Sequence, residues 1–245
     1  MAYNKSNREI EFGIYLAENR PEMIWGWGSP AGKVRAKRRA QLIIKNADLT
    51  DSQVVVEIGC GNGNFTNFFS KTGAYINALD ISPELINMAK QHAIQNERVN
   101  FLCQRFEDYQ PKCPVQAVIG SSVLHHLDLK PSLQNIYQIL EPGGRIAFAE
   151  PNFLNPQIFA ERTFLRPFLA HVSPDETAFT RCGISRKLSQ AGFTNVNVTP
   201  FDWLHPAVPK KFIPIVLQIG IVLEKIPIVK EFSGSLLITA QKPID

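Results

Sequence analysis

A run of alternate glycines directly after an apolar strand constrains this chain more than any other feature. Residues 54–58 read Val-Val-Val-Glu-Ile, which is typical of a buried strand, and residues 59–63 read Gly-Cys-Gly-Asn-Gly. Residues 65–69 then repeat phenylalanine at helical spacing. We therefore predict a strand, a tight loop and a helix, with bare backbone in the loop approaching a ligand.

The middle of the chain repeats this unit, because short apolar runs alternate with helical patterns. Such alternation is typical of stacked β-α units and a parallel sheet. Ser82, Pro83 and Glu84 predict a helix start, since they supply an N-cap, a proline at the first helical position and an early acid. After the first strand we expect strands at residues 75–80, 99–102, 116–121 and 145–150.

The pattern loosens beyond residue 151. We expect a helix that ends at Gly192 and strands at residues 195–199 and 235–240. Between these strands, residues 201–230 are rich in proline and large apolar side chains, which predicts an inserted apolar cap.

Two cofactor classes compete for the glycine loop. The dinucleotide fingerprint needs a third glycine three places after Gly61, where this chain has Asn64, so NAD is the second choice. Asp80 ends the next strand. In a parallel sheet Asp80 would face the loop, where its carboxylate can accept hydrogen bonds from both hydroxyls of a ribose.

Over residues 53–152 the sequence resembles the class I S-adenosylmethionine-dependent methyltransferases, and among them the small-molecule enzymes of the ubiquinone and menaquinone type. Four segments carry the resemblance in order: Glu-x-Gly-x-Gly-x-Gly at 57–63, Leu-Asp-Ile-Ser-Pro at 79–83, Val-Leu-His-His-Leu at 123–127 and Leu-Glu-Pro-Gly-Gly at 140–144. The resemblance implies an α/β fold with a Rossmann-like, seven-stranded, mostly parallel sheet. Its last strand would be antiparallel, and helices would cover both faces.

The same resemblance implies one methyltransferase domain over residues 1–245. Within it we expect an N-terminal helical lid at 1–50, a cofactor-binding core at 51–150, and a substrate cap with the last two strands at 151–245. The implied cofactor is S-adenosylmethionine, and the implied product of that cofactor is S-adenosylhomocysteine.

The resemblance also assigns cofactor-binding residues. Glu57 and the loop backbone are expected at the methionine end, Asp80 at the ribose and Ile81 at the adenine face. Many relatives place an Asp after the third strand, where this chain has Arg105 and Phe106, so a backbone N–H near Phe106 is expected at the adenine edge. The remaining members of the expected set are Gly59, Cys60, Gly61, Asn62, Gly63 and Ser121.

His125 and His205 are the candidate catalytic residues, as proton acceptors. The expected acceptor-binding residues, drawn mainly from the extensions before the first strand and after the fifth, are Trp25, Trp27, Glu150, Phe153, His171 and Trp203. The alternatives are that His125 only caps the loop after the fourth strand and that the two N-terminal tryptophans are packing anchors. Trp25 and Trp27 lie among glycines, which suits a loop that closes over a site.

The basic block formed by Lys33, Arg35, Lys37, Arg38 and Arg39 predicts a solvated helix face. The alternative is that one of its arginines binds the cofactor carboxylate or an acidic substrate.

Composition excludes several classes of protein. Lysine and arginine number 26 against 22 acids, and this net charge of +4 is too small for a dedicated nucleic-acid coat. The four cysteines show neither C-x-x-C pairs nor metal-ligand spacing, so we expect reduced thiols, no metal site and a cytoplasmic location. No apolar segment follows the start, so we expect no secretory signal, and the apolar stretch at 212–223 is shorter than the ~20 residues that span a bilayer.

The expected function is methyl transfer to a small, apolar molecule such as a quinone precursor or lipid. The apolar cap is flanked by lysines, which favours such an acceptor and peripheral contact with a membrane, although the same segment could be the face of a homodimer. A non-catalytic module that binds an adenosyl ligand or a partner is the main alternative. An RNA methyltransferase is less favoured. The sequence does not distinguish O, N and C methylation.

Overall fold

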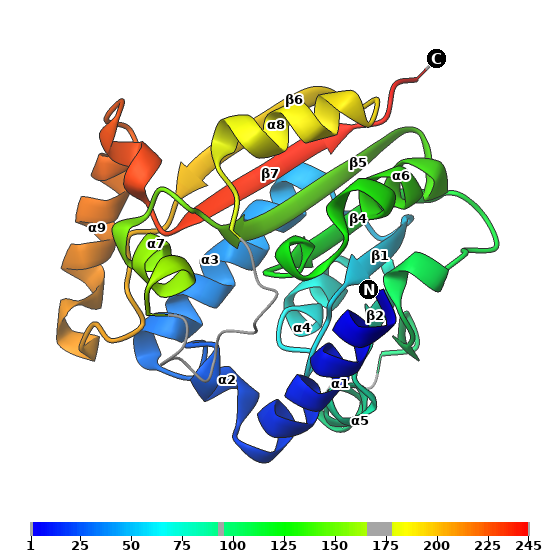
Figure 1. Cartoon of the computed structure of the whole chain (residues 1–245), viewed down its shortest axis with the longest axis horizontal. Helices are drawn as coiled ribbons and strands as arrows, with labels where there is room; N and C mark the ends of the chain where they lie inside the picture. Colours follow the sequence, from blue (N-terminus) through cyan, green and yellow to red (C-terminus); the bar gives the residue numbers. More distant parts are fainter. Residues whose placement is uncertain (1, 93–95, 166–177, 245) are drawn as a thin grey trace.

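The computed structural model describes residues 2–92, 96–165 and 178–244. They fold around a seven-stranded sheet of order β3-β2-β1-β4-β5-β7-β6 (Figure 1). The strands are β1 (Val54–Ile58), β2 (Tyr75–Asp80), β3 (Val99–Cys103), β4 (Val115–Ser121), β5 (Leu140–Pro151), β6 (Thr194–Phe201) and β7 (Ser235–Gln241).

The pairing of the strands confirms the predicted sheet. Strand β1 is parallel to β2 and β4, and β3 and β5 extend the sheet in the same direction. Strand β7 is antiparallel to both β5 and β6. The start of β5 differs from the prediction, because the strand begins at Leu140 rather than Arg145. Leu140 pairs with Val115 and Arg145 pairs with Ala117, so the extra residues lie in β5, where Gly143 takes a φ of 82°.

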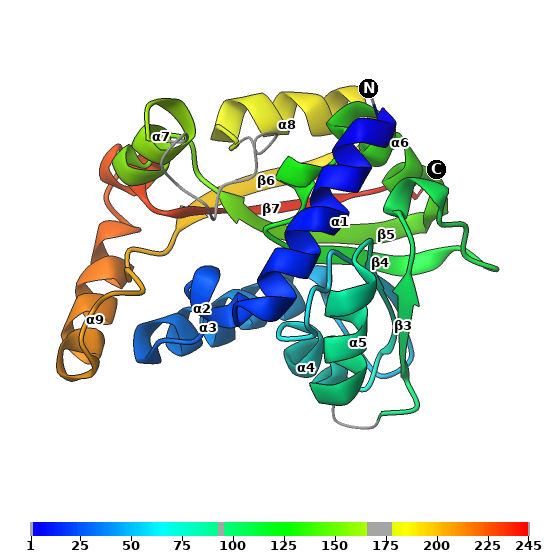
Figure 2. The ribbon, with the colours of Figure 1, turned by 60° about the horizontal axis from the view of Figure 1, so that its bottom comes forward.

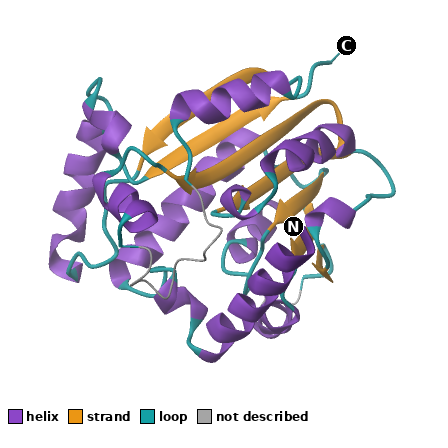
Figure 3. Cartoon of the chain, in the orientation of Figure 1, coloured by secondary structure: helices purple, strands orange, loops and turns teal. Residues whose placement is uncertain are grey.

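Helices cover both faces of the sheet (Figures 2 and 3). One face carries α3 (Pro30–Ala47), α4 (Thr66–Phe69) and α5 (Pro83–His92). The other carries α6 (Leu129–Ile139) and α8 (Arg181–Gln190). Each face therefore has its own apolar core. Burial of this apolar surface, at about 25 cal/mol per Å², is the main favourable term in folding.

In the described part of the chain, the helices outside these layers are α1 (Ala2–Glu18), α2 (Pro21–Ile24), α7 (Pro156–Thr163) and α9 (Ile213–Leu223). Helix α1 packs on the start of α5, where Gly13 lies so close to Ser82 that a larger residue would overlap its side chain. Helix α9 lies in the predicted cap, in the connection from β6 to β7. Short 3₁₀ turns are η1 (Ser70–Thr72), η2 (Phe106–Asp108), η3 (Leu124–His126), η5 (Lys210–Phe212) and η6 (Val229–Phe232).

The predicted solvated basic face is wrong for three arginines of α3. Arg35 forms an ion pair with Asp202 at 2.9 Å, and Arg38 forms a bidentate ion pair with Glu224. Arg39 is only 3% exposed. The acids lie more than 160 residues further along the chain, in the cap, so no local pattern could reveal them. These contacts attach α3 to the cap.

Arg39 binds the sheet near the carboxyl ends of β4 and β5 and at the start of β7. Its guanidinium donates hydrogen bonds to the Ser122 hydroxyl at 2.9 Å, to the Ala149 carbonyl at 3.1 Å and to the Ser235 hydroxyl. The cation also lies 5.1 Å from the centroid of the Trp27 ring. Burial lowers the pKa of Arg39 to about 10, so the group stays charged at neutral pH.

The four cysteines are free, as the sequence predicts, and Cys60 alone of the four is buried. Across the described part of the chain, no helix is both long and apolar enough to cross a membrane. Among the same residues, no three His, Cys, Asp or Glu side chains are grouped so that they could hold a metal ion.

Candidate functional site

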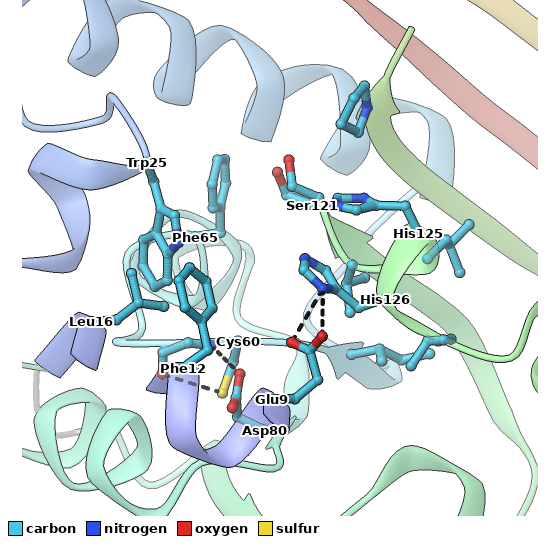
Figure 4. Close-up of a pocket in the computed structure, with 18 of the residues that line it drawn as sticks. Glu9, Phe12, Leu16, Trp25, Cys60, Phe65, Asp80, Ser121, His125 and His126 are labelled. Atoms are coloured by element: carbon cyan, nitrogen blue, oxygen red, sulfur yellow. Dashed lines mark hydrogen bonds and ion pairs between the residues drawn. The ribbon is translucent and has the colours of Figure 1, made fainter. Parts of the chain in front are cut away.

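A large cavity opens at the edge of the sheet where parallel strands β1, β2 and β4 end (Figure 4). The loops that follow these strands line it, together with α1, α2 and the segment after β6. Its volume is about 1340 Å³. A typical small-molecule site occupies about 300–1,000 Å³, so this cavity has room for two ligands side by side. Ligands of open α/β sheets bind at this edge.

The glycine loop and Asp80 are held together by hydrogen bonds at the centre of this edge. The Gly61 N–H donates to Asp80 Oδ2 at 2.8 Å, and the Ser82 N–H donates to Oδ1 at 2.9 Å. Burial raises the pKa of Asp80, and these two bonds partly oppose that rise. Since a carboxylate offers about four lone-pair sites, the oriented Asp80 can still accept hydrogen bonds from ribose hydroxyls.

The loop brings its backbone against the cavity because its glycines take a left-handed conformation. The φ angles of Gly59, Gly61 and Gly63 are 66°, 53° and 80°. A Cβ on Gly61 would lie 3.0 Å from the ring of Trp25, so the indole packs directly on the loop. Trp25 therefore lies against the glycine loop at the cavity (Figure 4).

Two asparagines of the loop present polar atoms that the described residues do not satisfy. Asn62 Oδ1 and Asn64 Nδ2 are buried without a hydrogen-bond partner there, and both residues line the cavity. A buried polar group without a partner costs about 1–3 kcal/mol. A polar ligand would offset this cost, which fits an amino-acid and nucleoside ligand such as S-adenosylmethionine.

Glu57 in β1 and Gly63 at the end of the loop do not line the cavity. The Glu57 carboxyl is 1% exposed, and burial raises its pKa to about 8, against a smaller opposing contribution from Thr66. Gly63 faces α5, where a Cβ would lie 3.2 Å from that of Ala89. Both residues were expected to bind the cofactor, and in the structure neither has direct access to a ligand in the cavity.

His125 and Glu150 form a buried pair beside the cavity. His125 Nδ1 lies 2.6 Å from Glu150 Oε2, and Glu150 Oε1 accepts the N–H groups of Val123 and Leu124 at 2.9 and 3.0 Å. Burial favours the neutral Glu150 carboxyl, but the hydrogen bonds outweigh it and lower its pKa. Burial lowers the pKa of His125 to about 4.

These values define the protonation of the pair at neutral pH. The carboxylate can only accept a hydrogen bond, so the proton of the neutral His125 imidazole lies on Nδ1 and the basic nitrogen is Nε2. His125 lines the cavity, whereas Glu150 is fully buried behind it. Glu150 thus orients the histidine and has no direct access to a ligand.

A second histidine of the same loop binds α1. His126 Nδ1 lies 3.2 Å from Glu9 Oε2, and both residues line the cavity (Figure 4). Sequence reasoning missed Glu9, His126 and the neighbouring Phe12 because the contact joins residues 117 positions apart. The repeated histidine at 125–126 was the local sequence signal for this part of the site, and from it the sequence predicted a role for His125 alone.

Most other residues that the sequence nominated also lie at this cavity. Phe153 does not line it and instead packs against Phe159, with ring centroids 5.3 Å apart. His171 lies outside the described residues. The nominated residues that line the cavity, besides those placed above, are Trp27, Cys60, Ile81, Arg105, Phe106, Ser121, Trp203 and His205.

Comparisons with known sequences agree with this geometry. Residues 56–148 match the family described as "Methyltransferase domain". The chain is 28% identical over 152 residues to the ubiquinone biosynthesis O-methyltransferase of Xylella fastidiosa, and 29% identical over 139 residues to that of Coxiella burnetii. These alignments cover 58% and 54% of this chain and 59% of each relative. The chain therefore spans about three-fifths of the length of these relatives.

Solved structures show the same fold. A chain from the complex between the Haloferax volcanii Trm112 methyltransferase activator and a putative methyltransferase superposes with a TM-score of 0.68 at 18% identity, covering 95% of this chain and 98% of that one. The N-methyltransferase NodS of Bradyrhizobium japonicum, bound to S-adenosylhomocysteine, gives a TM-score of 0.58 at 16% identity, covering 88% and 89%. Residues 56–148 are thus a methyltransferase domain, and with its matching core, glycine loop and strand-end aspartate the chain is similar to the class I S-adenosylmethionine-dependent methyltransferases.

Proposed function

We propose that this protein transfers the methyl group of S-adenosylmethionine to a small, apolar acceptor such as a quinone precursor or a lipid. One observation carries the proposal: a single cavity connects the glycine loop and Asp80 with His125 and with the residues after β6. A donor and an acceptor bound in one cavity can meet without leaving the protein.

The donor fits the end of the cavity at β1 and β2. Asp80 accepts the ribose hydroxyls there, Ile81 and Phe106 flank the adenine, and the loop with Asn62 binds the methionine end. When bound, S-adenosylmethionine supplies a methyl group that is already activated for displacement.

The acceptor fits the other end, where apolar side chains lie among polar ones such as Asn155, Gln157 and Lys187. Ile158 of α7, Phe179 before α8, and Trp203 and Leu204 after β6 line this region. Such walls bind an apolar ring or chain by excluding water from it. The relatives named ubiquinone biosynthesis O-methyltransferases support an oxygen nucleophile on a quinone precursor.

His125 would act on the acceptor as a proton acceptor. The bound donor would supply its methyl group to the acceptor oxygen by in-line displacement, with the bond from carbon to sulfur breaking as the new bond forms. The acceptor proton then moves to His125 Nε2, and the Glu150 carboxylate stabilises the resulting imidazolium at a contact of 2.6 Å. Alignment alone can contribute up to ~7–11 kcal/mol to such a reaction, so a weak base is sufficient.

A label-transfer experiment tests this proposal. The purified protein is incubated with methyl-labelled S-adenosylmethionine and separate lipid, metabolite and RNA fractions from cells, with Asp80→Asn as the matched variant of impaired donor binding. We expect label in an organic-extractable product of low molecular mass. Tight donor binding without transfer to any fraction would favour a non-catalytic binding module, and label in RNA would favour the RNA methyltransferase.

A further inference from the structure

Helix α9 is apolar on two sides, and one of them faces solvent. On its inner side, Ile213 is buried and Gly220 approaches Trp203. A Cβ added at Gly220 would lie 3.0 Å from the Cβ of Trp203. On its outer side, Ile215, Ile219 and Val222 are 59%, 52% and 56% exposed. Their spacing of four and three residues places them in one stripe along the helix.

This stripe continues beyond both ends of α9. Phe212 precedes it and Ile226 follows it at the same spacing, and both are exposed. The exposed Phe232 lies next to the start of α7, because its carbonyl accepts a hydrogen bond from Asn155 Nδ2 at 2.9 Å. Helix α7 and its flanks add a further set of exposed apolar side chains, namely Leu154, Phe159, Phe164 and Leu165.

We call the exposed apolar residues from 212 to 232, with those of α7, the apolar end of the molecule. Figures 1 and 2 both show α7 and α9 at the same end. Exposed apolar surface of this kind marks a binding surface, since monomeric soluble proteins rarely leave it uncovered.

Basic side chains lie at both ends of the stripe. Lys210 and Lys211 precede α9, and Lys225 and Lys230 follow it; within the described residues, none of the four forms an ion pair. The nearby acids are engaged inside the chain. Glu224 binds Arg38, and Glu231 lies 3.4 Å from Arg181.

This charge pattern identifies the occupant. A second copy of the chain would place lysines against lysines along the stripe, because both ends are basic whether the two helices run parallel or antiparallel. Like charges in contact oppose such a pairing. An anionic bilayer instead offers headgroups to the lysines at both ends and hydrocarbon to the apolar stripe between them.

We infer that the apolar end docks on an anionic membrane surface, with α9 lying in the plane of the interface. Helix α9 has 11 residues, too few to cross the bilayer, but its outer face can enter the boundary between headgroups and acyl chains. The inner side of the same helix contacts Trp203, which lines the cavity. Docking therefore places the acceptor end of the cavity beside the membrane.

This inference rests on the proposed function only for the claim that the docked protein takes its acceptor from the membrane. Binding to vesicles requires neither donor nor turnover, so it can succeed or fail independently of methyl transfer. The donor affinity, measured by calorimetry, reports on the proposed function separately.

Co-sedimentation with vesicles tests the docking. Full-length protein is mixed with vesicles of phosphatidylcholine alone or of phosphatidylcholine with phosphatidylglycerol. We expect strong partitioning onto the anionic vesicles and weak partitioning onto the neutral ones, and the difference should shrink as salt is added. Equal partitioning onto both, or none onto either, would overturn the inference.

Matched variants locate the surface. Replacing Lys210 and Lys211 by glutamine should weaken partitioning onto anionic vesicles roughly 10- to 30-fold, whereas the same change at the exposed Lys45 and Lys112 should alter it less than about twofold. Ile219→Glu should reduce partitioning at least about tenfold.

Ile244→Glu is the control for Ile219→Glu, since Ile244 is 76% exposed near the C-terminus, at the opposite end of the molecule in Figure 1. Unchanged donor affinity and melting temperature in each variant show that the fold is intact. The membrane inference would be overturned if the parent protein bound no vesicles but self-associated, and if Ile219→Glu made it monomeric. The surface would then be assigned to a second copy of the chain.

Discussion

Substitution of Asp80 by asparagine separates the two tasks of this carboxylate. One is to hold the loop through the Gly61 N–H at 2.8 Å, and the other is to accept the ribose hydroxyls. Asparagine keeps the size but only one oxygen acceptor, so one of the two backbone contacts, from Gly61 or from Ser82, can persist, and the negative charge is lost. Hydrogen bonds to a charged group contribute about 1.5–3 kcal/mol each. Loss of one such contribution should raise the Kd for donor or product roughly 10- to 150-fold.

Calorimetry with S-adenosylhomocysteine measures this change without turnover. Asp48→Asn is the matched control, because Asp48 is an exposed aspartate at the end of α3, remote from the loop, and its variant should bind as the parent does. Burial raises the pKa of Asp80, so the affinity of the parent, unlike that of Asp80→Asn, should also fall as the pH is lowered from neutral. An Asp80→Asn protein with unchanged affinity and an unchanged melting temperature would refute the ribose assignment.

Three further predictions concern residues around the same cavity. His125→Gln should lower kcat about 100-fold or more while the donor Kd stays within about twofold; an unchanged kcat in a steady-state assay would exclude it as the proton acceptor. The folded-state pKa of Glu57, about 8, lies above its ordinary value of 4.5, so the free energy of unfolding should fall by about 1.4 kcal/mol per pH unit between these values. Glu57→Gln should abolish that contribution, and denaturant titrations that show the same pH slope for both proteins would contradict the buried, protonated carboxyl. Trp25→Ala removes the indole that packs on Gly61 and should speed donor release about 3- to 10-fold in stopped-flow fluorescence, whereas an unchanged rate would show that this tryptophan does not cover the bound donor.

Features encoded by neighbouring residues were predictable from the sequence. The β1 strand, its glycine loop and Asp80 follow from short segments whose backbone conformation is local, and β1 and β2 have the predicted bounds. The last two strands were also predicted, with boundaries that shift by a few residues at most. Hydrophobic periodicity and turn chemistry carry this information over a few residues at a time.

Features that depend on contacts distant in sequence were not predictable. The contact of Glu9 with His126 and the ion pair of Arg38 with Glu224 each join separate elements, so neither residue's neighbours reveal its partner. The arginines of α3 therefore had the sequence pattern of a solvated face until the cap supplied their acids. The early start of β5 has a similar cause, because Leu140 becomes part of a strand only through its pairing with Val115.

The hydrogen bonds of the Arg39 guanidinium limit how far the N-terminus of this protein can be truncated. The matched family segment begins at residue 56, which suggests that the first fifty residues are an accessory that can be deleted. Yet Arg39 supplies the donors for the Ala149 carbonyl and the Ser235 hydroxyl, at the ends of two strands of the sheet. A fragment that starts at β1 would leave these acceptors unpaired and open the interior beneath them. Expression trials that trim the N-terminus should therefore stop short of α3.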